Sequence, residues 1–359
     1  MTAITHPTID LACRLIQYPS ITPNDHGCQA DIAAQLQTLG FEVNVWTVEG
    51  TTNLLASIGS GETTLLFAGH TDVVPPGPVD QWSSPPFEPT LRYGALYGRG
   101  ACDMKGAIAA FLEAIRRFLD QNILNGRLMI ALTSDEEGPA KHGMVEIIKQ
   151  LKNKKIHIDY CLIGEPTSTK TLGDGIKIGR RGSLNGFAQL FAQQGHVAYL
   201  SENPLHALGP LIQSMTSIQY AEPHPDFPPT QLQITHLHAG DGTTNIIPGE
   251  VQIQFNFRYA PTDSHLDLMK AMDACFTQTQ LKYTITWDHS ARPYHSPAST
   301  FADHVSEAIE RITQTQTHPN TAGGTSDGRF LIDLGCEIVE CGLSNASIHQ
   351  INEHVQVED

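Results

Sequence analysis

Short apolar runs alternate with segments of helical spacing through the first half of the chain. Buried strands are expected at 65–68, 127–133 and 160–164, because these runs are apolar and end in polar residues. Further strands are expected at 41–48 and 53–58, and helices at 7–17, 28–39, 105–120 and 144–151. Alternating strands and helices predict an α/β domain with a mostly parallel sheet and helices on both faces. Residues 75–89 contain six prolines and are expected to form an ordered loop over the site.

The pattern changes after Gly179, where polar and apolar positions begin to alternate as in half-exposed strands. Such strands are expected at 181–192, 231–238, 250–259 and 284–288, with helices at 205–217 and 266–279 between them. The order β-α-β-β-α-β predicts a ferredoxin-like α+β domain. The α/β pattern resumes after Pro293, with a helix at 301–314 and a strand at 337–341. We therefore expect a split catalytic domain, 1–179 and 293–359, with an inserted domain at 180–292.

Composition and charge exclude several classes of function. A chain of 359 residues suggests two domains. No apolar run approaches the roughly 20 residues needed to span a bilayer, and no basic region precedes the short apolar part of the N-terminus, so neither a membrane protein nor a secretion signal is expected. The net charge of −16 argues against a nucleic-acid partner. An anionic small-molecule substrate would need arginines placed locally.

The cysteines point to a reducing compartment. There are seven, an odd number, scattered along the chain without a Cys-x-x-Cys pair. This is neither a disulfide framework nor a thiolate zinc site. Reduced thiols are expected, and with them a cytoplasmic enzyme.

Metal-capable side chains follow three of the predicted strands. His70, Glu137 and Glu165 each lie just beyond a strand end, where ligand chemistry collects in open α/β sheets. With Asp103 and His349 they form a set of imidazoles and carboxylates, which suits zinc, cobalt or manganese. Five ligands exceed the need of one tetrahedral ion, whereas two ions sharing a bridging carboxylate would use them all. Asp103, which lies between sharp turns, is the natural bridge.

Two neighbouring acids have predicted supporting roles. Asp72 could accept the proton on the second imidazole nitrogen of His70 and so fix its tautomer. Glu136 points to the opposite side of the backbone from Glu137, so it can act as general base on a metal-bound water. Zinc lowers the pKa of such a water to about 7.

Several long motifs resemble the aminoacylase/carboxypeptidase-type dizinc amidohydrolases. They are GHTDVVP (69–75), YGRGACDMKG (97–106), SDEEG (134–138) and GEP (164–166). Three more, GRRGS (179–183), GGTSDGR (323–329) and HQINE (349–353), resemble the branch of that family that removes succinyl groups. The resemblance covers nearly the whole chain. It implies hydrolysis of N-succinyl-LL-2,6-diaminopimelate to succinate and LL-2,6-diaminopimelate, in the bacterial lysine and cell-wall pathway.

The resemblance also implies roles for individual residues. His70 and Glu165 would hold one zinc, Glu137 and His349 the other, and Asp103 would bridge the two Zn²⁺ ions, with Co²⁺ as a possible substitute. Glu136 would be the general base, Asp72 would support His70, and the peptide bond after Asp103 would be cis. The inserted domain would close over the substrate and form a homodimer, with His196 reaching the partner's active site to stabilise the oxyanion. Residues implied to bind substrate carboxylates and amides are Arg180, Asn245, Arg258, Thr325, Arg329 and Asn345.

Other functions remain as alternatives. Residues 324–328 fit the Gly-x-Ser-x-Gly pattern of serine hydrolases, but the preceding stretch is polar and broken by Pro319. A dinucleotide site at Gly98-x-Gly100 lacks its third glycine. The chain could also be a non-catalytic metal-binding or scaffolding protein, but such a function would not require a general base at Glu136. Within the resembled family, acetylornithine deacetylase or an aminoacylase is the main alternative.

Overall fold

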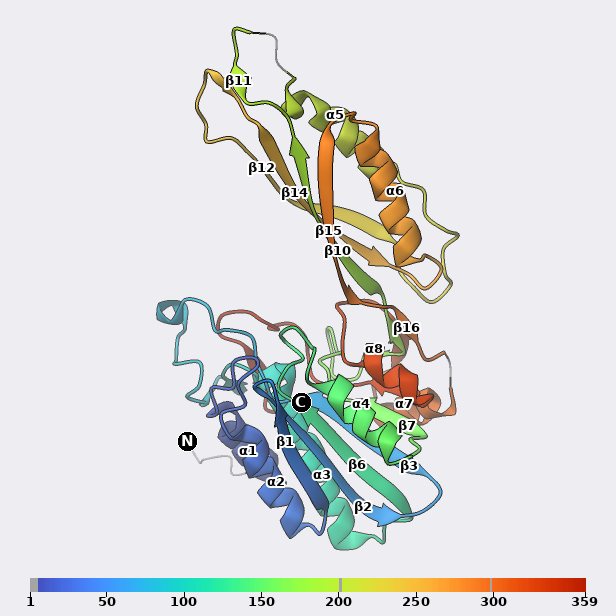
Figure 1. Ribbon diagram of the computed structural model, residues 1–359. Helices are drawn as coiled ribbons and strands as arrows, with labels where there is room; N and C mark the ends of the chain where they lie inside the picture. The colour runs from blue at the N-terminus through green and yellow to red at the C-terminus, as the bar shows by residue number, and fades with distance from the viewer. Residues whose placement is uncertain (1–5, 200–201, 298) are drawn as a thin grey trace. The chain divides into compact units, whose positions relative to one another are not determined.

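The computed structural model describes residues 6–199, 202–297 and 299–359, and the chain forms two compact units (Figure 1). Unit 1 comprises Met1–Gly179, Ser296–Asn320 and Ser326–Asp359, and unit 2 comprises Arg180–His295 and Thr321–Thr325. The segment Thr321–Thr325, which the sequence analysis assigned to the catalytic domain, therefore groups with unit 2. Residues 1–5 of the N-terminal segment lie outside the described residues.

An eight-stranded sheet forms the centre of unit 1, in the order β1-β2-β6-β3-β7-β18-β8-β17. Strands β6, β3, β7 and β18 are parallel, as are β8 and β17. The sheet is mixed rather than mostly parallel, because β2 runs antiparallel to β1 and β6, and β8 runs antiparallel to β18. Its strands are β1 (Glu42–Val48), β2 (Thr51–Ser60), β3 (Thr64–His70), β6 (Gly126–Thr133), β7 (Tyr160–Ile163), β8 (Gly175–Lys177), β17 (His318–Asn320) and β18 (Glu337–Glu340).

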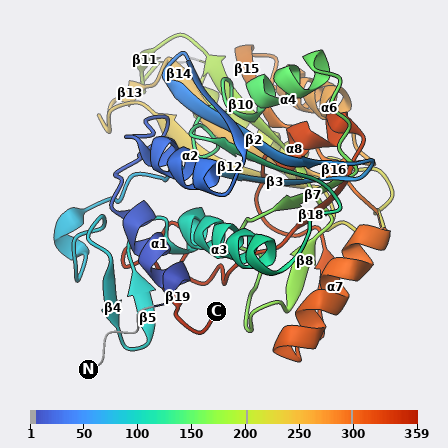
Figure 2. The same cartoon turned by 90° about the horizontal axis from the view of Figure 1, so that it is seen from below.

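Helices cover both faces of this sheet (Figure 2). The first three helices pack against one face through a large apolar core, and the fourth and eighth lie on the other face. A smaller three-stranded sheet, β19-β5-β4, lies in the same unit. The helices of unit 1 are α1 (Pro7–Ile16), α2 (Cys28–Thr38), α3 (Gly106–Gln121), α4 (Met144–Asn153), α7 (Thr300–Thr313) and α8 (Gly328–Leu331), with short helical turns at Val79–Gln81, Ala101–Lys105 and Ile332–Leu334; the small sheet contains β4 (Thr90–Arg92), β5 (Ala95–Tyr97) and β19 (His354–Gln356).

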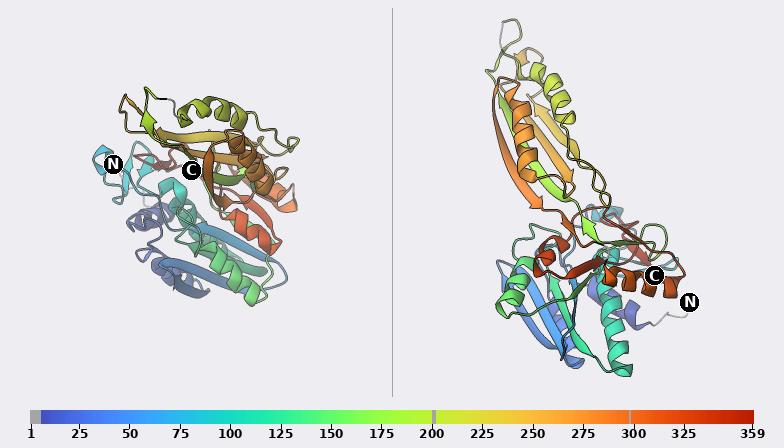
Figure 3. Two further views of the ribbon diagram at one scale, coloured as in Figure 1. Left: turned by 45° about the horizontal axis from the view of Figure 1, so that its top comes forward. Right: turned by 90° about the vertical axis from the view of Figure 1, so that its right-hand side faces the viewer.

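Unit 2 contains a four-stranded antiparallel sheet in the order β12-β14-β10-β15, with α5 and α6 on one face (Figure 3). The main elements follow one another as β-α-β-β-α-β, the ferredoxin-like order. Alternate residues of β14 are buried against the helices, as the sequence pattern predicts. The elements are β10 (Gly182–Phe191), β11 (Gly195–His196), α5 (Pro204–Thr216), β12 (Gln231–Ala239), β13 (Ile246–Ile247), β14 (Glu250–Tyr259), α6 (His265–Thr277), β15 (Lys282–Ala291) and β16 (Tyr294–His295); β9 (Gly179–Arg180) precedes them.

Local sequence signals set the ends of several helices. The Ser264 and Ser299 side chains accept the N–H groups of Leu266 and Ala302, which caps α6 and α7. The predicted helices are all present, with ends within two residues of those expected. The strands of two or three residues and α8 were missed, because elements of this length have no periodicity to detect. Of the helices that the structure describes, none combines the length and apolar composition of a membrane span.

Candidate metal centre

Three parallel strands bring the predicted ligands to one edge of the unit 1 sheet. β3 is almost wholly buried between β6 and β7 and ends at His70. Glu165 follows β7 and Glu137 follows β6, at the same carboxyl edge. Because parallel strands end together, residues far apart in sequence become neighbours there.

Two glycines allow the segment around Asp103 to approach this edge. Met104 packs so closely that a Cβ at Gly69 would lie 2.3 Å from its Cε, and a Cβ at Gly164 would lie 2.6 Å from the same atom. The Met104 Sδ atom also accepts the backbone N–H of His70 at 3.4 Å. The Asp103–Met104 peptide bond is cis, as the resemblance implies. These contacts place the Asp103 carboxylate next to the end of β3.

Two groups of potential ligands share the Asp103 carboxylate. In the first, His70 Nε2 lies 3.1 Å from Asp103 Oδ1 and 3.5 Å from Glu165 Oε1, and all three side chains are buried. In the second, His349 Nε2 lies 3.3 Å from Asp103 Oδ2 and 2.9 Å from Glu137 Oε1. The His349 side chain is 48% exposed, so the second group is open to solvent. Each oxygen of Asp103 therefore faces a different group.

The donor set and its spacing fit a pair of transition-metal ions. Ligand atoms bonded to one tetrahedral zinc at about 2.0–2.1 Å lie about 3.3 Å apart. The four nitrogen–oxygen distances in the two groups range from 2.9 to 3.5 Å, which brackets this value. Imidazole together with carboxylate suits zinc and its neighbours rather than calcium or magnesium.

Asp72 supports the site through its backbone as well as its carboxylate. The His70 Nδ1 atom lies 2.9 Å from the main-chain oxygen of Asp72, whereas the carboxylate Oδ1 is 3.7 Å away. A proton on Nδ1 is therefore donated to the carbonyl rather than to the carboxylate, and Nε2 is left free to bind a metal. The carboxylate instead accepts the backbone N–H groups of Glu137, at 3.0 Å, and Glu136, at 3.4 Å. Asp72 thus ties the acidic turn to the end of β3.

Glu353 is a supporting residue to which the sequence analysis assigned no role, although it ends one of the quoted motifs. Its buried carboxylate accepts the backbone N–H groups of Gly100, Cys102 and Asp103 at 3.0, 3.0 and 3.1 Å. It also pairs with the buried guanidinium of Arg99 at 2.6 Å. Glu353 therefore holds the main chain that presents the shared carboxylate. An isolated glutamate gave no local signal of this role, because its partners lie about 250 residues away.

The histidines and carboxylates of the site shift one another's pKa values. Burial opposes a charged His70, but hydrogen bonds with Asp103 and Glu165 outweigh it and raise the pKa of His70 well above its usual value. Burial also opposes ionisation of Asp103, yet its hydrogen bonds with His349 and His70 lower the pKa of this carboxyl. Hydrogen bonds with Asp103 and Glu137 raise the pKa of His349 to about 10. Imidazoles that attract protons so strongly are placed to attract a cation instead.

The remaining carboxyls of the site have raised pKa values. Burial, followed by repulsion from Asp103, raises the pKa of Glu165 to about 7. Burial and the charge of Glu165 raise the pKa of Glu136 well above its usual value. Burial likewise raises the pKa of Asp72 to about 7. Adjacent acids with displaced pKa values are typical of catalytic sites.

The residues implied to bind substrate fall in both units. In unit 1, Arg329 is buried on α8, and Asn345 donates its backbone N–H to Ser168. In unit 2, Arg180 Nη1 donates to the Ala322 carbonyl at 3.2 Å, in the segment that also carries Thr325.

The other two implied residues and His196 belong to unit 2. His196 and Asn245 are neighbours: the strands β11 and β13 pair there, and the Asn245 carbonyl accepts the N–H of Val197 at 3.2 Å. Both residues are exposed. Arg258 lies on the central strand β14 opposite Ser183, and desolvation lowers the pKa of its guanidinium.

The geometry does not favour a serine nucleophile. Ser326 is fully buried, and its hydroxyl donates a very short hydrogen bond to the Glu340 carboxylate. A short strand, β17, does precede it, but this strand ends at Asn320. A nucleophile must be accessible next to a general base.

Comparison with known proteins places the chain in one family. Residues 66–359 match the profile of Peptidase family M20/M25/M40. Succinyl-diaminopimelate desuccinylase of Thiobacillus denitrificans is 46% identical over 355 residues, which cover 98% of this chain and 91% of that protein. The enzyme of the same name from Thioalkalivibrio sulfidiphilus is 45% identical, covering 98% of this chain and 94% of that protein.

Solved structures share the fold at lower identity. An M20 family metallo-carboxypeptidase from Sulfolobus solfataricus superposes with a TM-score of 0.83 at 20% identity, covering 99% of this chain and 96% of that chain. A tripeptidase from Staphylococcus aureus superposes with a TM-score of 0.80 at 20% identity, covering 98% and 93%.

Proposed function

The chain belongs to Peptidase family M20/M25/M40, and from this premise we propose that it hydrolyses the amide bond of N-succinyl-LL-2,6-diaminopimelate. The products are succinate and LL-2,6-diaminopimelate. The observation that carries the proposal is the pair of histidine–carboxylate groups that share Asp103. The choice of substrate rests on relatives named succinyl-diaminopimelate desuccinylase, which are 43–46% identical to this chain over nearly its whole length.

Two divalent ions fit the site, with zinc as the proposed metal and cobalt as a substitute. His70 and Glu165 would hold one ion, Glu137 and His349 the other, and Asp103 both. Once bound, the ions supply Lewis-acid polarisation of the amide carbonyl and acidify the attacking water.

Glu136 is the proposed general base. It takes the proton from the attacking water and transfers it to the leaving amine, which must be protonated before it departs. Asp72 holds the turn that carries Glu136, chiefly by accepting the backbone N–H of the adjacent Glu137 at 3.0 Å.

The substrate carries carboxylates, and the chain has a net charge of −16, so local cations must attract it. We assign this role to Arg180, Arg258 and Arg329, whose planar guanidinium groups bind carboxylates through paired hydrogen bonds. Asn245, Thr325 and Asn345 would bind amide and carboxylate groups of the substrate. His196 would stabilise the oxyanion in the active site of a partner subunit, which requires a homodimer. The seven free cysteines agree with a location in the cytoplasm.

Substrate profiling tests the proposal. The metal-loaded chain should release succinate from N-succinyl-LL-2,6-diaminopimelate faster than it releases acetate from N-acetylornithine or from N-acetyl amino acids. Dipicolinate, a metal chelator, should abolish turnover, and a fluorophosphonate should leave it unchanged. Faster cleavage of N-acetylornithine would assign the chain to a different activity in the same family. Inactivation by the fluorophosphonate alone would reject metal-dependent hydrolysis.

A further inference from the structure

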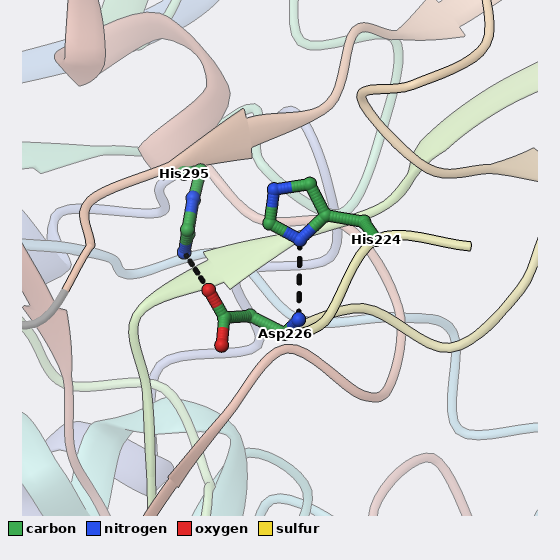
Figure 4. Close-up of side chains that lie close together, drawn as sticks. All are labelled: His224, Asp226 and His295. Atoms are coloured by element: carbon green, nitrogen blue, oxygen red, sulfur yellow. Dashed lines mark hydrogen bonds and ion pairs between the residues drawn. The ribbon is translucent and has the colours of Figure 1, made fainter. Parts of the chain in front are cut away.

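Unit 2 contains a third group of potential metal ligands, separate from the five residues described above. It consists of His224, Asp226 and His295, and one ligand atom from each lies within 4.8 Å of the others. Figure 4 shows the three side chains converging. His224 and Asp226 lie in the loop between α5 and β12, and His295 ends β16. All three belong to unit 2, so their arrangement is a property of that unit alone.

The group is held in place by contacts around it. The Asp226 carbonyl accepts a hydrogen bond from Thr321 Oγ1 at 2.5 Å. The buried Phe227 ring packs edge-on against the rings of His224 and His295, with centroids 4.9 and 5.1 Å away. The stretch 223–229 also contains four prolines, which restrict its backbone. Side chains held in this way lose little freedom when they bind a ligand.

One nitrogen of the group is buried and makes no hydrogen bond within the described part of the chain. His295 Nε2 has no hydrogen-bond partner among the residues that the structure describes. Its acidic neighbour, Asp226 Oδ2, lies 3.4 Å away, which exceeds the 2.7–3.2 Å typical of an N–H···O hydrogen bond. The same distance matches the separation of about 3.3 Å between two ligands of one tetrahedral zinc. The pair is therefore spaced for a shared ion better than for a direct hydrogen bond.

The His224 ring sets a limit on affinity. Its Nδ1 accepts the backbone N–H of Asp226 at 3.1 Å, so in the neutral ring the proton lies on Nε2. A cation must displace either this hydrogen bond or this proton. We therefore expect weaker binding here than at the paired groups in unit 1.

The geometry points to a third divalent-cation site, in unit 2, with His224, Asp226 and His295 as ligands of zinc or a similar transition metal. Two imidazoles and one carboxylate are donors that zinc accepts, and three protein ligands leave a fourth position for water. Asp226 is exposed, so an ion can reach the group from the solvent. The ion would link the 223–229 loop to β16 and so stiffen the part of unit 2 that precedes Ser296. This inference does not depend on the proposed amide hydrolysis.

Metal binding to the full chain tests the site. Protein already loaded with two equivalents of zinc is dialysed against further zinc, and bound metal is measured by mass spectrometry. Wild type should take up a third equivalent, and both His224→Gln and Asp226→Asn should lose it. The control is His238→Gln, a change at an exposed histidine on β12 that stacks on His236 and belongs to none of the potential ligand groups found among the described residues. This control should keep the third equivalent.

Hydrogen exchange provides a second readout. Binding of the third equivalent should slow exchange in residues 221–229 of wild type but not of Asp226→Asn, because the ion stabilises the folded conformation of this loop. Circular dichroism checks that each variant is folded, and if His224→Gln is not, Asp226→Asn alone decides. The inference is overturned if wild type binds no more zinc than a folded Asp226→Asn, whatever the number held by unit 1. It is also overturned if His238→Gln loses the same equivalent.

Discussion

The substitution Glu353→Gln tests whether the position of the shared Asp103 carboxylate depends on Glu353, which accepts the backbone N–H of Asp103. Glu353 accepts four hydrogen bonds through its two oxygens. Oε1 accepts the N–H groups of Cys102 and Asp103, and Oε2 accepts that of Gly100 and the guanidinium of Arg99. Glutamine has the same shape but only one acceptor oxygen, so its NH₂ group must face two donors in either orientation.

The expected loss of stability follows from these contacts. Removing the charge leaves the Arg99 guanidinium buried and uncompensated, which costs about 3–5 kcal/mol. A second donor left without an acceptor adds to this loss, and local rearrangement offsets part of it. We therefore expect the free energy of unfolding to fall by about 4 kcal/mol. For a unit of this size the melting temperature should fall by about 10 °C.

The effect on metal binding should be separable from the effect on stability. Because Glu353 holds the backbone N–H of Asp103, its loss should weaken metal binding by about 10- to 100-fold. Thermal unfolding and chelator competition on the same preparation measure the two effects. The matched control is Glu113→Gln, which breaks ion pairs with Arg116 and Arg117 on α3. Glu113 is buried but both arginines are half exposed and can be solvated by water, so this change should cost less stability than Glu353→Gln and leave metal affinity unchanged.

Two results would refute the reasoning. If Glu353→Gln binds both ions with wild-type affinity, the residue does not position the shared carboxylate, whatever happens to stability. If Glu113→Gln weakens metal binding equally, the loss reflects general destabilisation.

Three further predictions concern single residues. Glu136→Ala should keep its metal content, by mass spectrometry, and lose at least about 10²-fold in turnover, as expected for loss of a general base; near-normal turnover would exclude this role. His349→Ala should lose one of two metal equivalents on dialysis, because His349 contacts only the second group; retention of both would contradict its assignment. Burial raises the pKa of Asp174, but the backbone N–H groups of Lys170 and Thr169 outweigh it and lower the pKa to about 2. The ionised Asp174 carboxylate therefore stabilises the folded chain fully above about pH 4, and this contribution disappears as the pH falls to about 2. At pH 6, Asp174→Asn should lower the free energy of unfolding, measured with urea, by about 1 kcal/mol. An unchanged unfolding curve would show that the turn does not depend on this carboxylate.

The arrangement of the unit 1 sheet shows where prediction from sequence stops. The helices and longer strands were predicted closely, because their apolar spacing repeats along the chain. The direction of β2 and β8 relative to their neighbours was not, because strand pairing depends on residues far away in sequence. The sheet is mixed for this reason, although βα alternation suggested a mostly parallel one.

In the candidate site, too, the residues could be predicted from the sequence but their atomic contacts could not. Residue type and position just beyond a strand were enough to select His70, Glu137 and Glu165 as candidate ligands, and the structure brings them into the two groups that share Asp103. The atoms involved were not predictable: the acceptor for His70 Nδ1 is the Asp72 carbonyl rather than its carboxylate.

The sequence by itself determined which residues form helices and long strands, and which acids and histidines follow the strand ends. These properties depend on neighbours a few residues apart, so they leave a periodic pattern in the chain. Only the tertiary structure decided that Glu353 supports Asp103 and that His224, Asp226 and His295 meet. Contacts between residues tens to hundreds of positions apart depend on how whole helices and strands pack. A shift of about one ångström in a side chain decides whether it can bind a metal ion.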